Sequence, residues 1–78
     1  MKKIYADIVG WYGVGAILAA YTLATFGILL FGGLWYQLLN LTGSLGIVIV
    51  AMTKKDRQPA VLNIVWAAIA LIALLRLL

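Results

Sequence analysis

Apolar residues fill three long stretches of this chain, and short polar or glycine-rich segments separate them. Each stretch is about 19 to 20 residues long, which is enough for a helix to cross a hydrocarbon core of roughly 30 Å. The stretches lack the strict alternation of membrane β-strands, and three strands are too few to close a barrel. Because backbone groups in lipid must be hydrogen-bonded within the chain, helices remain. We therefore predict three transmembrane helices, over residues 8–27, 34–52 and 59–77.

The segments between the stretches contain residues that end or begin helices. Gly32 and Gly33 follow the first stretch, and Gly27 is an earlier candidate for the end of its helix. The hydrophilic segment 53–58 separates the second and third stretches. Pro59 comes next and suits the first position of a helix, where a missing N–H removes no intrahelical hydrogen bond.

The composition agrees with a membrane protein. Hydrophobic residues make up 67% of the chain, charged residues make up 10%, and the mean hydropathy is +1.15. A soluble domain would have about a quarter charged residues. The chain contains no Cys and no His, so it lacks thiol nucleophiles, imidazole bases and the usual ligands of transition metals. We predict a single all-α membrane domain over residues 1–78, a three-transmembrane-helix bundle that is not an enzyme and holds no metal or cofactor.

The basic residues lie at the ends of the apolar stretches and indicate how the chain is inserted. One side of a three-span protein would hold Lys2, Lys3, Lys54, Lys55 and Arg57, and the other side would hold Arg76. Since cytoplasmic loops are enriched in Lys and Arg, we predict a protein of the cytoplasmic (inner) membrane with its N-terminus in the cytoplasm and its C-terminus outside. The net charge of +4 gathers at these ends, so we expect no nucleic-acid binding. The first stretch shows no convincing signal-peptidase site, and we expect it to remain a span.

Small residues recur at the spacing that favours close helix packing in lipid. Gly15/Ala19 and Ala16/Ala20 are four residues apart in the first stretch. Such pairs let helix backbones approach, and dispersion contacts then hold the helices together. We predict packing or gating roles for Gly10, Gly13, Gly15, Gly43, Gly46 and Pro59. Packing is the simpler interpretation, and the alternative is that the glycines of the first helix let it bend during gating.

Several amide and aromatic side chains lie inside the predicted spans. An amide that faces lipid is costly, so these groups should face a neighbouring helix or a wet cavity. Counting depth at about 1.5 Å per residue from the basic side, we expect Tyr21 to meet Asn40 and Ser44 to meet Trp66. Asn40 and Asn63 suit interhelical hydrogen bonding and solute binding equally well. The candidate solute-binding residues are Asn63, Asn40, Trp66 and Tyr21.

No carboxylate lies in the middle of a predicted span. Asp7 is near one span end and Asp56 is in the hydrophilic segment. Proton-coupled membrane machines generally need such a group, so we expect any transport to be passive and to act on a neutral or weakly polar solute. The aromatic residues near the span ends are typical of an interfacial belt: Trp11, Tyr12, Trp35 and Tyr36.

Two patterns resemble those of an uncharacterised family of short three-span bacterial membrane proteins. Tyr-Gln-Leu-Leu-Asn at 36–40 is followed by Pro-x-x-Leu-Asn-x-x-Trp at 59–66. The Asp-Ile-x-Gly-Trp start of that family is matched at 7–11. The similarity covers nearly the whole chain and implies a three-span fold without an established activity.

More distantly, the layout resembles the SemiSWEET and PQ-loop transporters, which are three-helix units that dimerise around a solute path. In that group a proline of the third helix is followed four residues later by an asparagine that faces the solute, and Pro59 and Asn63 match this spacing. The chain departs from the group because its first helix lacks the Pro-Gln pair and its second helix lacks the tryptophan, for which Tyr36 or Trp66 would substitute. The charge count also gives the opposite orientation.

The exposed small-residue and amide surfaces of so small a protein call for partners besides the lipid bilayer. A single copy cannot enclose a solute path, so we predict a homo-oligomer, with a two-fold dimer favoured. Our leading hypothesis is a small transporter-like protein that passes a neutral polar solute passively through a homodimer. The alternative is a structural or regulatory small subunit that docks onto a larger membrane complex.

Overall fold

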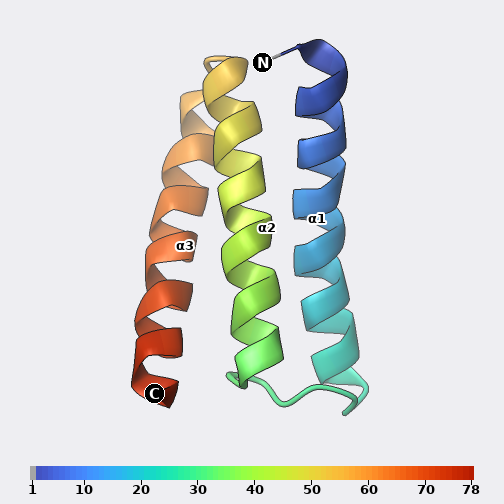
Figure 1. Cartoon of the computed structure of the whole chain (residues 1–78), viewed down its shortest axis with the longest axis vertical. Coiled ribbons are helices and arrows are strands. Elements are labelled where there is room, and N and C mark those ends of the chain that lie inside the picture. The colour runs from blue at the N-terminus through green and yellow to red at the C-terminus, as the bar shows by residue number, and fades with distance from the viewer. Residues whose placement is uncertain (1) are drawn as a thin grey trace.

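The computed structural model describes residues 2–78, which fold into three helices. These are α1 (Lys3–Thr25), α2 (Leu34–Thr53) and α3 (Arg57–Leu77), and each runs antiparallel to the next along the chain (Figure 1). Residues 2–78 contain no β-strand, and every helix is long and apolar enough to cross a membrane. The predicted all-α fold with three candidate transmembrane helices is therefore confirmed.

The bounds of α1 differ most from the prediction. The helix begins at Lys3 rather than near residue 8, since the polar residues of its first turns extend toward water without interrupting it. It ends at Thr25, after which Gly27 adopts a φ of 79°. The amide that follows Gly27 donates to the carbonyl of Leu23 over 2.8 Å, as is usual where a left-handed glycine ends a helix.

The connection between α2 and α3 is tight. Lys55 has a φ of 56°, and the amide of Asp56 donates to the carbonyl of Ala51 over 2.8 Å, which ends α2 in the same manner. Because α3 begins at Arg57, Pro59 occupies the third helical position rather than the predicted first. A proline there still removes no hydrogen bond, since the first amides of a helix have no intrahelical acceptor.

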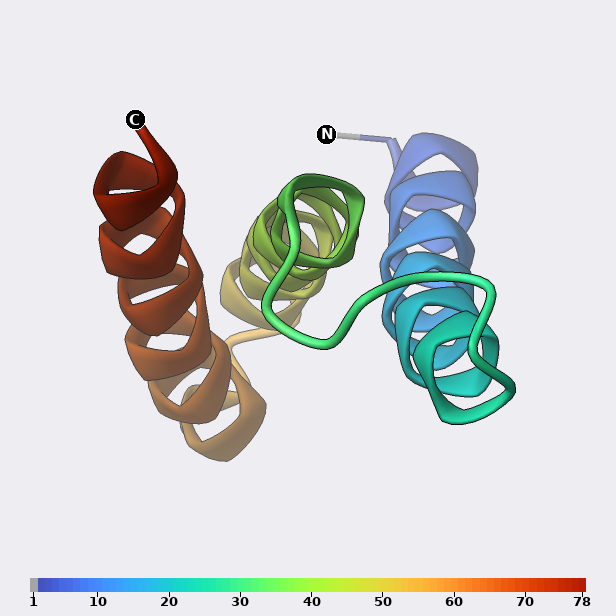
Figure 2. The same ribbon diagram turned by 90° about the horizontal axis from the view of Figure 1, so that it is seen from below.

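Helix α2 lies between α1 and α3. It packs against both neighbours, whereas no Cα atom of α1 lies within 8 Å of one in α3 among the described residues. Figure 2 shows α2 between the other two helices, so that the three form a bent row. The protein therefore has two separate helix interfaces, and α2 takes part in both.

The two ends of the helices, along their long axes, differ in charge. The N-terminus and the α2–α3 connection lie at one end, and the α1–α2 connection and the C-terminus lie at the other (Figure 1). We call the first of these the basic end, since it holds Lys2, Lys3, Lys54, Lys55 and Arg57. Arg76 lies in the last turn of α3, at the opposite end.

Small residues form the interior, and large apolar residues face outward. On α3 the buried face consists of Ala60, Asn63, Ala67 and Ala70, at alternating spacings of three and four residues. On α1 it consists of Ala6, Gly13, Ala16, Ala20 and Ala24. Large apolar side chains such as Trp11 and Ile72 remain exposed. This arrangement suits lipid, because acyl chains cover the large side chains while the small ones let the helices approach.

Candidate functional site

The interface between α1 and α2 is a close approach of two backbones. A Cβ atom added to Gly13 would lie 2.6 Å from the carbonyl oxygen of Gly43, and one added to Gly43 would lie 2.9 Å from that of Gly13. A Cβ atom on Gly46 would lie 3.1 Å from another carbonyl of α1. Gly10 is less confined, because its added Cβ would meet the flexible side chain of Val50 at 3.2 Å. The spacing of α1 and α2 therefore depends on glycine.

Gly15 lies outside this interface. A Cβ atom added there would meet no atom within 4 Å, and the residue is exposed. Of the two small-residue pairs on α1, Ala16 and Ala20 are buried, whereas Ala19 is only partly covered. A packing role for Gly15 thus requires a neighbour from outside a single copy of the chain.

A hydrogen bond between side chains joins α2 to α3. The indole N–H of Trp66 donates to Oδ1 of Asn40 over 3.0 Å, and Nδ2 of Asn40 donates to the carbonyl of Tyr36 over 2.8 Å. Asn40 is only 4% exposed. Its amide is therefore bonded at both ends and shielded from lipid, as a polar group inside a membrane requires.

An open pocket with a volume of 190 Å³ lies beside this hydrogen bond. We call it the Asn40–Trp66 pocket, and it is lined by Tyr36, Gln37, Asn40, Trp66, Ile69 and Ala70. Trp66 is 46% exposed, so part of its ring remains open to a ligand. The side-chain amide of Gln37 forms no hydrogen bond within residues 2–78, so it is free to bond to a ligand. From the sequence, Gln37 is one of the polar residues inside the spans, but it was not selected as a solute-binding candidate, although it lies three residues before Asn40 on the same side of α2.

Asn63 is buried next to the pocket but does not line it. Its Nδ2 donates to the carbonyl of Pro59 over 2.9 Å, a bond that runs along α3 and does not cross to α2. Asn63 lies on the same face of α3 as Trp66, one turn closer to the basic end. Two of the candidate binding residues, Asn40 and Trp66, thus come together, whereas Asn63 lies one turn from Trp66 and outside the lining of the pocket.

Tyr21 lies away from this pocket. It is 61% exposed, and its ring packs edge-on against Phe31 with a centroid distance of 6.3 Å. Phe31 in turn lies 5.5 Å from Tyr36, which lines the pocket. The expected meeting with Asn40 does not occur, because Gly13 opposite Gly43 sets a register in which Tyr21 is level with the start of α2.

Ser44 does not bond to Trp66, so that prediction was wrong. Its side chain is completely buried, and its Oγ has no hydrogen-bond partner. Because Trp66 lies opposite Asn40 and the helices are antiparallel, Ser44 is level with Asn63, one turn away from Trp66. The depths counted from the sequence were therefore in error by about one helical turn.

A second pair of side chains bridges α1 and α2, and sequence reasoning did not anticipate it. The hydroxyls of Tyr12 and Thr42 lie 2.8 Å apart, and Thr42 also bonds to the carbonyl of Leu38 at 2.9 Å. Tyr12 had been assigned to an interfacial belt. Because α1 begins at Lys3, it lies near the middle of a 23-residue helix instead. The pair is exposed at the side of the row, where lipid or another protein would cover it.

The Asn40–Trp66 pocket is suited to binding a small neutral molecule. Its lining residues include an amide that is free to donate and accept, a phenol and part of an indole ring, and they include no carboxylate, Lys or Arg. Ile69 and Ala70 add apolar contact. Small-molecule sites likewise combine an apolar wall with a few polar groups, but at 190 Å³ this pocket is smaller than the roughly 300–1,000 Å³ usual for them.

Comparison with known proteins finds one matching family and gives no activity for the chain. The model of one uncharacterised protein family matches residues 6–78, a range that includes the 7–11, 36–40 and 59–66 patterns. No curated protein and no solved structure matches the chain.

Proposed function

The chain belongs to that uncharacterised family, and we propose that it is a small transporter that passes a neutral polar solute passively through a homodimer. The observation that carries the proposal is the Asn40–Trp66 pocket. Its Gln37 amide has no hydrogen-bond partner within the described part of the chain, although the helices around it are apolar enough for lipid. Gln37 is the fourth residue of α2, one turn from the end of the helix, and a solute that enters the pocket there would bond to its amide.

The row of helices supports the dimer in this proposal. Because α1 and α3 do not approach each other, one copy forms an open wall rather than a closed path. A second copy related by two-fold symmetry would close the open side with the same residues. In this arrangement Asn40 fixes the Trp66 ring, Asn63 holds the adjoining turn of α3, and Gln37 bonds to the solute. Tyr21 acts from outside the pocket, through its contact with Phe31.

The proposal also includes an orientation and a gate. The basic end faces the cytoplasm and the protein resides in the inner membrane, since five of the six Lys and Arg residues lie at that end. Bending of α1 occurs near Gly15, where an added Cβ would meet no atom, rather than at Gly13, which is locked against α2.

Flux measurements on a matched pair of variants test the transport proposal. Purified protein in liposomes is assayed by light scattering for permeability to small neutral solutes, with glycerol and urea as the first probes. Gln37→Leu should reduce the flux of a transported solute at least ten-fold. Gln58→Leu, which makes the same change in the exposed first turn of α3, should leave it unchanged. Native mass spectrometry of both variants verifies that the copy number is preserved.

Several results would oppose transport. Equal flux through wild-type protein and Gln37→Leu would remove the pocket from any path. Loss of the oligomer in Asn63→Leu would identify that amide as an element of assembly. A preparation that is monomeric in lipid would exclude a path between protomers.

The second candidate function is that of a structural or regulatory subunit of a larger membrane complex. The exposed Tyr12–Thr42 pair favours it, since two hydroxyls near the middle of a span suit contact with another protein. This function predicts a larger protein that co-purifies in fixed ratio and is lost from Tyr12→Phe/Thr42→Val protein. Retention of that protein by the double variant would place the contact elsewhere.

A further inference from the structure

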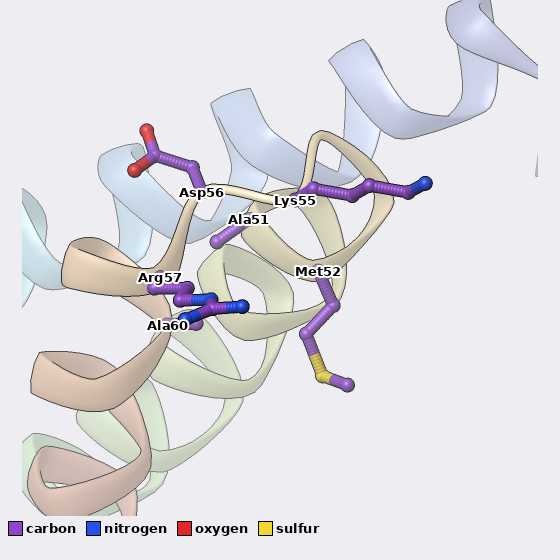
Figure 3. Close-up of a pocket in the computed structure, with 6 residues that line it drawn as sticks. All are labelled: Ala51, Met52, Lys55, Asp56, Arg57 and Ala60. Carbon is purple, nitrogen blue, oxygen red and sulfur yellow. The ribbon is translucent and has the colours of Figure 1, made fainter.

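A second recess lies at the basic end, between the last turn of α2 and the first turn of α3. Its volume is 290 Å³, and it is lined by Ala51, Met52, Lys55, Asp56, Arg57 and Ala60 (Figure 3). Ala51 and Ala60 are buried and form its apolar floor, whereas the Met52 side chain is largely exposed. The recess therefore combines two basic side chains with an apolar base, at the point where the hydrophilic segment meets the apolar helices.

The positive charge of this recess is not neutralised by its own acidic residue. Figure 3 shows the Asp56 carboxylate pointing away from the Arg57 guanidinium. Within residues 2–78 neither Lys55 nor Arg57 forms an ion pair. Two unpaired cations beside an apolar floor favour an anion that also carries an apolar part.

The backbone of one of these basic residues has a defined conformation. Lys55 has a φ of 56°, in the left-handed region that non-glycine residues rarely adopt. Its amide donates to the carbonyl of Met52 over 3.1 Å, and the next amide donates to the carbonyl of Ala51 over 2.8 Å. The end of α2 thus sets where the Lys55 backbone lies, and Figure 3 shows its side chain extending away from the Arg57 guanidinium.

We propose that this recess binds the phosphate headgroup of an anionic phospholipid. The exposed Lys55 and Arg57 side chains, which extend in different directions in Figure 3, turn toward the bound phosphate, and the first part of an acyl chain lies along Met52 toward the membrane interior. Basic pockets between transmembrane helices bind such headgroups, because the surface charge of anionic lipid and the bilayer position of its phosphate match them. The site is independent of the Asn40–Trp66 pocket and does not require transport.

Lys54 supplies a matched control, since it neighbours Lys55 in the chain but does not line this recess. Full-length protein in detergent is titrated with phosphatidylglycerol or phosphatidylcholine of the same chains, and bound lipid is counted by native mass spectrometry. We expect the wild type to retain phosphatidylglycerol in preference to phosphatidylcholine. Lys55→Gln and Arg57→Gln should each weaken retention of phosphatidylglycerol about five-fold. Lys54→Gln removes the same charge from outside the recess, so it should weaken retention less than about two-fold.

Three outcomes would overturn the proposal. Equal losses in the Lys54→Gln and Lys55→Gln variants would mean diffuse attraction to a basic surface. Equal retention of the two lipids by wild-type protein would mean that the headgroup charge is not recognised. Displacement of phosphatidylglycerol by millimolar inorganic phosphate would identify a site for the free anion instead of the lipid. Circular dichroism of each variant verifies that the helices remain folded.

Discussion

The two helix interfaces of this protein are built differently. Between α1 and α2, glycine lets the backbones touch, and an added Cβ atom at Gly13 would lie 2.6 Å from a carbonyl oxygen. Between α2 and α3, alanine covers most of the contact, and the bond from Trp66 to Asn40 crosses it. The first interface depends on the shape of two backbones, whereas the second also depends on hydrogen bonding.

Open space also differs in its surroundings at the two interfaces. Near the basic end of the first interface, a pocket of 220 Å³ is lined by residues that include Asp7 and Lys54. At the second interface, Tyr36 and Trp66 border the pocket of 190 Å³, whose lining has no charged residue. The expected cost of disturbing each interface differs as well. Adding a methylene to a packed contact typically costs about 1–3 kcal/mol. A hydrogen bond between membrane helices contributes only about 0.6 kcal/mol on average.

The largest effect is expected from a methyl group at the α1–α2 contact. Gly13→Ala should lower the free energy of unfolding by about 2 kcal/mol, because the helices must separate to admit the new atom. The chain contains no Cys, so dyes on Lys3→Cys and Gln58→Cys can report unfolding in mixed detergent micelles by energy transfer.

Gly15→Ala is the matched control for this measurement. It adds the same methyl group to the same helix, but the added Cβ meets no atom within 4 Å. Its stability should be unchanged or higher by up to about 1 kcal/mol, since alanine favours helix more than glycine does. Similar losses from the two substitutions would show that the backbones of α1 and α2 are not in contact at Gly13.

A smaller effect is expected when the polar contact of the second interface is removed. Asn40→Ala and Trp66→Phe should each lower the free energy of unfolding by about 1 kcal/mol, through lost packing and one lost hydrogen bond. A double-mutant cycle should give a coupling energy of about 0.6 kcal/mol between the two residues. The same dye pair measures all four proteins.

Additive effects would contradict the hydrogen bond between Asn40 and Trp66. The matched cycle uses Asn63→Ala in place of Asn40→Ala. Asn63 bonds to Pro59 within α3, so its coupling to Trp66 should be close to zero. Coupling as strong as that of Asn40 would mean that all three side chains act as one polar network.

The fold followed from the sequence because its signals are long and repeated. Three apolar stretches with glycine or charged residues between them specify three helices, and lipid leaves the chain no other regular structure. The helix ends were harder to predict. Lys3 and Asp7 were taken to precede α1, but polar residues at a membrane surface remain helical when their side chains extend into water.

That early start accounts for much of what sequence reasoning missed in the site. Depth was counted from residue 8, so Tyr12 was assigned to the interface and Tyr21 was matched with Asn40. The lateral order of the helices could not be predicted either, because no sequence pattern indicates that α2 lies between α1 and α3. Asn40 and Trp66 were both named as candidates, since amides and indoles in an apolar stretch require a partner, but each was matched with the wrong partner.

The smallest expected effect comes from the buried hydroxyl of the second interface, and it has the opposite sign. Ser44 is fully buried, and its Oγ lacks a partner, so it contributes no hydrogen bond to the contact between α2 and α3. Ser44→Ala should raise the free energy of unfolding by about 0.5 kcal/mol, because alanine is the better helix former and no bond is lost.

Thr42→Val provides the comparison on the other face of the same helix. Valine keeps the shape and nearly the helix propensity of threonine but lacks the hydroxyl that contacts Tyr12 at 2.8 Å, so the substitution should lower stability by about 0.6 kcal/mol in the same assay. Opposite signs for Ser44→Ala and Thr42→Val would show that a polar residue stabilises α2 only where its partner is in place. A loss of stability in Ser44→Ala would instead mean that Ser44 bonds across to α3, for which Asn63 is the level neighbour. The second interface would then hold two polar contacts, and Asn63 would serve assembly rather than the solute.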